Sequence, residues 1–89
     1  MTLHELKIKP MYYEAVVNGE KRFEIRKDDR NFKVGDLIRL QEFENDYTGR
    51  ESLYEIIFKI DGGDYGLEIG YCILSIKPYR SETYLGITI

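Results

Sequence analysis

The sequence contains very few of the residues on which several kinds of functional site depend. Its 89 residues include one cysteine, Cys72, and one histidine, His4. An internal disulfide is therefore impossible, and a structural zinc site, which needs four nitrogen or sulfur ligands, is not expected. A Ser–His–Asp relay would have to use His4, and no serine stands in the glycine-flanked spacing of a nucleophile elbow. We expect no metal and no cofactor.

Long apolar runs and phosphate-binding glycine loops are also missing. No run approaches the ~20 apolar residues that a membrane helix needs, and the N-terminus lacks the pattern of a signal peptide. The glycines do not follow the spacing of either common phosphate loop. Together with the single cysteine, these absences predict a soluble, cytoplasmic protein with no membrane partner.

The charge is distributed unevenly along the chain, although its net value of −3 does not in itself indicate a nucleic-acid-binding protein. Residues 1–40 hold nine Lys and Arg against seven Asp and Glu, whereas residues 41–89 hold four against nine. Any anion-binding surface is therefore expected to come from the first half of the chain. An ordinary solvated surface is the alternative explanation of the same asymmetry.

Length and residue pattern predict a single domain over residues 1–89 that is mainly β. Short alternating segments at regular spacing indicate a small barrel of five or six mostly antiparallel strands. The segment Tyr84–Ile89 either adds a last strand or trails as a tail. The predicted strands are His4–Ile8, Arg22–Arg26, Leu37 to Phe43 or Glu44, Leu53–Ile60 and Tyr71–Lys77.

One short helix is predicted over residues 10–18, between the first two strands. Pro10 fits the first turn of a helix, and Asn18-Gly19 can adopt the left-handed conformation that ends one. The side chains expected to pack near the core are Met11, Ala15 and Val16.

The side-chain pattern also assigns loops and faces. Polar residues over 44–49 predict a hairpin loop, and Tyr71–Lys77 is apolar on both faces, as in a buried central strand. In Leu53–Ile60, the residues expected to share one side are Tyr54, Ile56, Phe58 and Ile60.

The most informative stretch is Gly19–Arg26, which contains a helix end, then Lys21, then Glu24 and Arg26 on one face of a strand. A functional interpretation is a cleft edge at which Lys21 and Arg26 bind an anion or a polar base edge while Glu24 orients them. The alternative is a solvated strand face, with an ion pair that contributes roughly a few tenths of a kcal/mol.

This stretch resembles the G-x-K-x-x-E-x-R pattern of ASCH domains, a branch of the PUA-like barrels. The wider sequence is similar to a bacterial and phage family of unknown function with a PUA-like fold, to which RNA binding is ascribed. The resemblance covers about residues 4–77, and residues 79–89 lie outside it. The residues that carry it are His4–Ile8, Tyr13, Gly19, Lys21, Phe23–Lys27, Asp29, Arg30, Phe32, Val34–Asp36, Tyr47–Arg50, Gly70 and Tyr71.

The resemblance implies a PUA-like or ASCH-like β-barrel that binds RNA or a modified nucleobase between its early helix and the barrel. Some small bacterial relatives resemble amidohydrolases of N4-acetylated cytidine, in which a lysine and a threonine of the motif act with a late acidic residue. Lys21 matches that lysine, but Glu24 stands at the position of the threonine, and the late acid has no obvious counterpart. In an enzyme of this kind, Lys21 and Glu24 would be catalytic.

Three functions therefore remain open. The favoured one is a binding module for RNA or a modified nucleoside, without catalytic residues. The second is an amidohydrolase acting on N4-acylated cytidine, and the third is a phage or bacterial accessory domain that binds another protein. A large exposed apolar patch away from Lys21 would favour the third. The expected ligand-binding residues are Lys21, Glu24, Arg26, Lys9 and His4.

Overall fold

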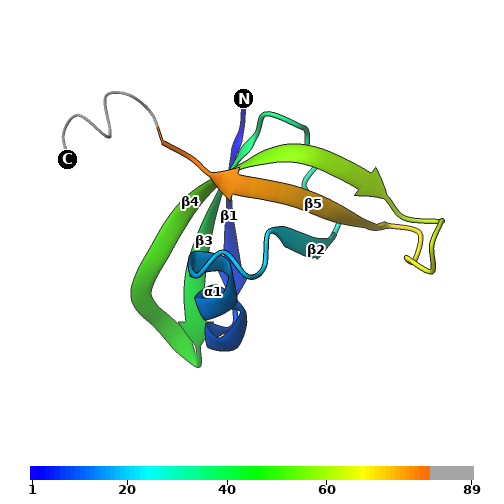
Figure 1. The fold of residues 1–89 in the computed structure, drawn as a ribbon. Helices are drawn as coiled ribbons and strands as arrows, with labels where there is room; N and C mark the ends of the chain where they lie inside the picture. The colour runs from blue at the N-terminus through cyan, green and yellow to red at the C-terminus, as the bar shows by residue number, and fades with distance from the viewer. Residues whose placement is uncertain (81–89) are drawn as a thin grey trace.

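The computed structural model describes residues 1–80, which form five strands and one short helix (Figure 1). The mainly β prediction with one early helix is confirmed, whereas the segment Tyr84–Ile89 lies outside the described residues. No helix in this part of the chain is long and apolar enough to cross a membrane. The elements are β1 (Leu3–Ile8), α1 (Pro10–Val17), β2 (Phe23–Lys27), β3 (Leu37–Glu44), β4 (Asp46–Asp61) and β5 (Tyr71–Pro78).

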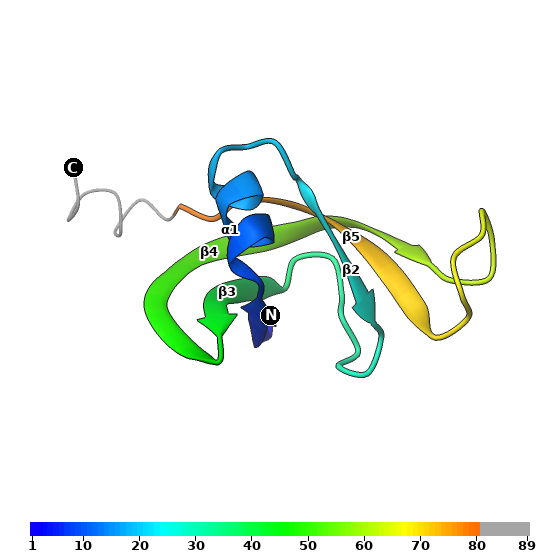
Figure 2. The same ribbon diagram turned by 90° about the horizontal axis from the view of Figure 1, so that it is seen from below.

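The five strands form one sheet in the order β1-β3-β4-β5-β2. The β1–β3 pair is parallel and the other three pairs are antiparallel. The sheet curls into a half-barrel, and α1 lies on its concave side (Figures 1 and 2). Because β1 and β2 occupy the two edges of the sheet, the segment that joins them, including α1, spans the open side of the half-barrel.

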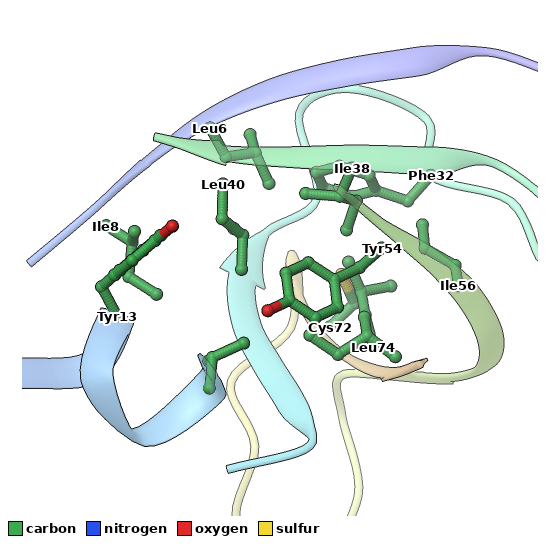
Figure 3. Packing of buried hydrophobic residues seen from close by; sticks show 12 residues of the cluster. Leu6, Ile8, Tyr13, Phe32, Ile38, Leu40, Tyr54, Ile56, Cys72 and Leu74 are labelled. Carbon is green, nitrogen blue, oxygen red and sulfur yellow. The ribbon is translucent and has the colours of Figure 1, made fainter. Parts of the chain in front are cut away.

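The core fills the concave side of the sheet beneath α1 (Figure 3). Alternate residues of each strand point inward, as the period-2 pattern requires. The loop before β3 contributes one large side chain, Phe32, which is 2% exposed. The residues of this cluster are Leu6, Ile8, Tyr13, Val16, Phe32, Ile38, Leu40, Tyr54, Ile56, Cys72, Leu74 and Ile76.

The helix occupies its predicted place and buries Val16 as predicted, but its other buried side chain is Tyr13 and not Met11. Pro10 stands in its first turn, and Gly19, with φ +79°, follows its C-terminal end. Tyr13 and Val16 are buried, whereas Met11 is 67% exposed, so the prediction that Met11 packs near the core is wrong. The Tyr13 hydroxyl shares a 2.7 Å hydrogen bond with the Ser52 hydroxyl on β4, which fixes this rotation of the helix.

The connection between β3 and β4 is tighter than predicted. β3 ends at Glu44 and β4 begins at Asp46, so the expected loop over 44–49 is wrong. Asn45, with φ +65°, forms the turn alone, because asparagine tolerates the left-handed conformation. The polar residues that follow belong to an exposed part of β4, where they need no apolar partner.

A register shift in β4 changes which side chains face the core. The β4–β5 ladder is interrupted between Ile56 and Phe58, so that Ile57 is an extra residue. Tyr54 and Ile56 are buried, but Phe58 is 59% exposed and Ile60 is 37% exposed. The prediction that all four share one side is therefore wrong, because the bulge moves the second pair to the outer face.

In β2, the side chains alternate between two faces as predicted. The acid of the charged face is buried and the apolar face is exposed, which is the reverse of a usual strand. Phe23 and Ile25 lie on the outer face and are 41% and 53% exposed. Glu24 points to the concave side and is 2% exposed. The interpretation of this charged face as solvated is therefore wrong, since the half-barrel curls over it.

Candidate functional site

A groove of about 760 Å³ lies between α1 and β2, on the open side of the half-barrel. It takes its cationic side chains from the first half of the chain, where the sequence placed any anion-binding surface. The lining residues are Lys7, Ile8, Lys9, Met11, Tyr12, Ala15, Glu20, Lys21, Phe23, Glu24, Ile25 and Arg26.

The end of α1 determines where Lys21 stands. The backbone N–H groups of Glu20 and Lys21 both donate to the carbonyl of Ala15, at 2.9 and 3.0 Å. The chain is thereby held against the last turn of the helix before it enters β2. Lys21 is in this way placed at the corner where helix and strand meet.

Glu24 lies in the floor of the groove between two cations. Arg26 donates to Glu24 Oε1 from Nε at 3.0 Å and from Nη2 at 2.7 Å, and Lys21 Nζ donates to Glu24 Oε2. Lys21 Nζ also donates to the Phe23 carbonyl at 2.8 Å, and Arg26 Nη2 to the Lys7 carbonyl at 2.9 Å. Both carboxylate oxygens are satisfied, and the two cations are tied to the backbone of both edge strands.

The three groups differ in how much they reach solvent. The side chain of Glu24 is 3% exposed, whereas those of Lys21 and Arg26 are 18% and 23% exposed. A buried carboxylate is costly unless it is paired and hydrogen-bonded, and here it is both. The carboxylate therefore serves as a fixed anchor, and the two cations present hydrogen-bond donors to the groove.

Two aromatic rings flank Lys21. Its Nζ lies 5.7 Å from the ring centroid of Tyr12 on α1 and 5.0 Å from that of Phe23 on β2. Tyr12 is 43% exposed and Phe23 is 41% exposed, so each ring is open to a ligand. The groove thus combines hydrogen-bond donors held by Glu24 with two aromatic rings beside Lys21.

Of the five residues expected at the site, the structure brings four to this groove. Lys21, Glu24 and Arg26 are in direct contact, and Lys9 lines the groove as the residue before α1. His4 is elsewhere: its Nε2 lies 2.9 Å from Asp36 Oδ2, and its ring packs edge-on against Phe32 at 4.7 Å between centroids.

Asp36 and Cys72 have structural surroundings. Burial tends to raise the pKa of the Asp36 carboxyl, but hydrogen bonds from His4 and from the backbone N–H groups of Thr2 and Lys33 outweigh it and hold the pKa below its usual value. Cys72 is fully buried, and that burial raises the pKa of its thiol, which makes it a poor nucleophile. Neither residue lines the groove.

A third buried acid, Glu42, was not singled out from the sequence. It accepts a 2.7 Å hydrogen bond from the Thr48 hydroxyl, and Arg50 Nη1 lies 3.7 Å from its other oxygen. The Arg50 guanidinium also lies 4.9 Å from the ring centroid of Tyr13. The alternation around Glu42 in β3 placed it on the inward face, and this was the available signal.

The described part of the chain holds no metal-binding cluster but has a second hollow. Within residues 1–80, no group of at least three His, Cys, Asp or Glu side chains is placed to hold a metal ion. A second hollow, of about 950 Å³, lies between α1, β4 and β5, and Lys21 lines both hollows.

Two comparisons relate the chain to other proteins. The family described as "Domain of unknown function (DUF3850)" matches residues 3–76, which include the whole groove. A protein of Escherichia phage P2, described as "Uncharacterized 12.9 kDa protein in GpA 3'region", is 42% identical over 50 residues. That alignment covers 55% of this chain and 46% of the phage protein, so the chain matches about half the length of that relative.

Proposed function

This chain belongs to the DUF3850 family, and we propose that it is a binding module for single-stranded RNA or a modified nucleobase, built on a PUA-like barrel of the ASCH type. The observation that carries the proposal is the carboxylate of Glu24, buried and held between Lys21 and Arg26 in a groove with aromatic walls. The resemblance of Gly19–Arg26 to the ASCH pattern supports the same function.

The floor of the groove offers donors suited to a base edge. The hydrogen bonds of Arg26 within residues 1–80 use Nε and Nη2, so the two N–H groups on Nη1 are available to a ligand. Lys21 Nζ makes two such bonds and has a third N–H. Donors held in fixed positions recognise the carbonyl and ring-nitrogen acceptors of an unpaired base.

The walls and the size of the groove fit a planar ligand. Tyr12, on α1, can stack on a base, because every base has a π-face. A volume of about 760 Å³ lies within the usual range for small-ligand sites. Recognition by stacking and hydrogen bonding also explains how a chain of net charge −3 could bind RNA, since it needs few phosphate contacts.

The proposal is tested by titrating the full chain with short single-stranded RNAs and with a panel of plain and modified nucleosides. Replacing Tyr12 with leucine removes a wall but leaves the Glu24 contacts in place. Because stacking contributes about 1–3 kcal/mol per base, Tyr12→Leu should weaken binding by roughly five- to 150-fold. Tyr65→Leu is the matched control, since Tyr65 is 95% exposed in a loop outside the groove and its replacement should change nothing.

The salt dependence of binding and an assay for turnover complete the experiment. Two or three phosphate contacts predict a shallow salt dependence, with a log–log slope of about 0.7 for each contact. Release of acetate from N4-acetylcytidine, lost in a Glu24→Gln variant, would identify an amidohydrolase that uses Lys21 and Glu24. The absence of binding to all the RNAs and nucleosides, even at low salt, would contradict the proposal.

A further inference from the structure

The outer, convex face of β2, β5 and β4 is apolar where the sheet faces solvent. Phe23 and Phe58 both stand opposite Ser75 of β5, and Ile25 and Ile60 both stand opposite Ile73. Side chains opposite one another on neighbouring strands share a face, so these residues form two adjacent rows. We call them the outer face: Phe23, Ser75, Phe58, Ile25, Ile73 and Ile60.

The apolar area that this face exposes is comparable with the largest apolar patch of a typical monomer. Phe58 is 59% exposed, Ile25 53%, Phe23 41% and Ile60 37%, and Tyr71, in the next row, is 37% exposed. Taking ~150–200 Å² for each whole side chain, the four residues of the face expose about 290–380 Å² of mostly apolar surface, and Tyr71 beside them adds about 55–75 Å². Patches of this size on a small soluble domain commonly mark an interaction site.

The rows contain no charged residue, which decides between a protein and a nucleic acid as the partner. A nucleic acid partner would need cations for its phosphates, whereas the centre of this face is built from Ile25, Ile73 and Ile60. Charges stand at its two ends, where Lys27 lies opposite Tyr71 and Glu55 lies opposite Lys77, and Lys21 Nζ lies beside the Phe23 ring. An apolar centre with a charged rim is the usual anatomy of a protein–protein interface.

We propose that this face is the contact between two copies of the chain, which pack sheet against sheet as a homodimer. A standard interface buries about 800 Å² on each partner, of which about 56–65% is apolar, and the outer face supplies most of that apolar share. A two-fold axis through the face would reverse one copy and bring its Lys27 end over the Glu55–Lys77 end of the other. At that end Glu55 and Lys77 already pair with each other at 4.0 Å, so the apolar rows, and not the rim charges, supply the attraction between the two copies.

The dimer leaves the floor of the groove free. Lys21 and Arg26 contact Glu24, which points to the concave side, whereas Phe23 and Ile25 stand on the outer face of the same strand. Phe23 and Ile25 also line the groove, so the partner copy would lie along its outer rim. The two grooves of the dimer would then be held at a fixed separation.

The test measures the mass of the full chain by light scattering over a roughly hundredfold range of protein concentration, because mass action governs a dimer. The expected mass at high concentration is twice the 10.5 kDa of one chain. Phe58→Glu should reduce it to that of one chain. Val34→Glu is the matched control, because Val34 is 60% exposed on a loop outside the face, and this variant should remain dimeric.

A second measurement separates loss of the dimer from loss of the fold. The Tm of the natural chain should rise with protein concentration, whereas that of Phe58→Glu should not, while both keep the same circular dichroism spectrum. A natural chain that is monomeric over the whole range, or a Phe58→Glu variant that dimerises as well as the natural chain, would overturn the proposal. Loss of RNA binding in Phe58→Glu with a monomeric natural chain would overturn it too, by assigning the face to nucleic acid.

Discussion

The side chain of Glu24 has almost no contact with water. Neighbouring side chains donate the hydrogen bonds that water would otherwise make to its carboxylate. Lys21 and Arg26 supply three such bonds to its two oxygens, and their own side chains remain about a fifth exposed. Burial of one partner and partial exposure of the others makes each group dependent on the remaining two. Substitution of Glu24 is therefore expected to affect both stability and ligand binding.

Glu24→Gln should lower the free energy of unfolding by about 1–3 kcal/mol, because the amide leaves two neighbouring cations without their counter-charge. The measurement is chemical denaturation of both chains under the same conditions. Glu51→Gln is the control, since Glu51 is half exposed and its contact with Arg39 is 3.6 Å long. A Glu24→Gln chain as stable as Glu51→Gln would show that the cluster contributes nothing to folding.

The second prediction at this scale concerns Asp36, whose pKa is lowered below its ordinary value of 3.8. A group whose pKa is lower in the folded state stabilises the protein above the unfolded pKa, and that contribution disappears as the pH falls through the folded pKa. Asp36→Asn should therefore cost about 1–3 kcal/mol at neutral pH. The difference between the two chains should shrink once the pH falls below about 4.

Thermal unfolding between neutral pH and the acid limit measures this difference. Asp64→Asn, in the exposed loop after β4, is the comparison, and its stability should follow that of the natural chain at every pH. A cost of Asp36→Asn that does not change with pH would mean that the negative charge of Asp36 contributes no stability. Its hydrogen bonds with His4, Thr2 and Lys33 would then stabilise the fold equally well when the carboxyl is neutral.

At the scale of elements, arginine side chains from β2 and from the loop that follows it bind the edge strand β1, where no backbone ladder joins β2 to β1. Arg26 Nη2 donates to the Lys7 carbonyl, and Arg30 Nη1 donates to the Glu5 carbonyl, each at 2.9 Å. Both carbonyls belong to β1, an edge strand with one row of backbone groups not used by β3. We call these two arginine contacts with β1 the seam. They close the half-barrel through side chains, and each hydrogen bond can break without the other.

Arg30→Ala should loosen this seam with little effect on overall stability. Because the bond is exposed, its loss should cost less than about 1 kcal/mol. The amides of β1 should nevertheless exchange with solvent several-fold faster, since local opening becomes easier. Arg22→Ala, which removes an exposed bond to the Gly19 carbonyl, should leave β1 exchange unchanged, and equal exchange in the two variants would contradict the role of the seam.

The loop between β4 and β5 contains a glycine that the surrounding backbone leaves no room to replace. A Cβ on Gly62 would overlap the Glu68 carbonyl oxygen and lie 2.8 Å from that of Tyr71. Gly62→Ala should therefore destabilise the chain by about 2 kcal/mol or more, because the atoms it meets are backbone atoms. Gly66→Ala meets open space at φ +78° and should cost only about 1–2 kcal/mol, so equal Tm losses would contradict the steric argument.

The elements themselves follow from local patterns, and their errors come from longer-range packing. Alternation correctly placed His4, Leu6 and Ile8 on one buried face, because β1 is regular along its whole length. The alternation could not reveal the bulge at Ile57, because the apolar residues continue through it without a break. The extra residue nevertheless moves the side chains that follow it in β4 to the opposite face of the sheet.

The candidate site could be located in the sequence but its environment could not. Period-2 geometry put Glu24 and Arg26 on one face, and the helix end put Lys21 beside them. Which face of β2 meets the core depends on how the sheet curls, and the usual rule of apolar residues inside gives the opposite answer here. A strand that breaks this rule is where a binding site is most to be expected.

At the scale of the whole molecule, one strand serves two surfaces. β2 presents Glu24 to the groove and Phe23 and Ile25 to the outer face, and it is held in the sheet by β5. A change that displaces β2 should therefore affect ligand binding and self-association together. Phe58→Glu, on β4, and Tyr12→Leu, on α1, are expected to separate the two, because each touches one surface only.

The order of the strands in the sheet also has a consequence for how the protein is made. β2 is synthesised early, but its neighbour is β5, whose last residue is Pro78. Such distant pairings are slow to form, so β2 is expected to join the sheet late in folding. Glu24→Gln should then speed unfolding and leave the refolding rate almost unchanged in stopped-flow experiments. A nascent chain would in that case acquire its groove only after nearly all of the described residues have left the ribosome.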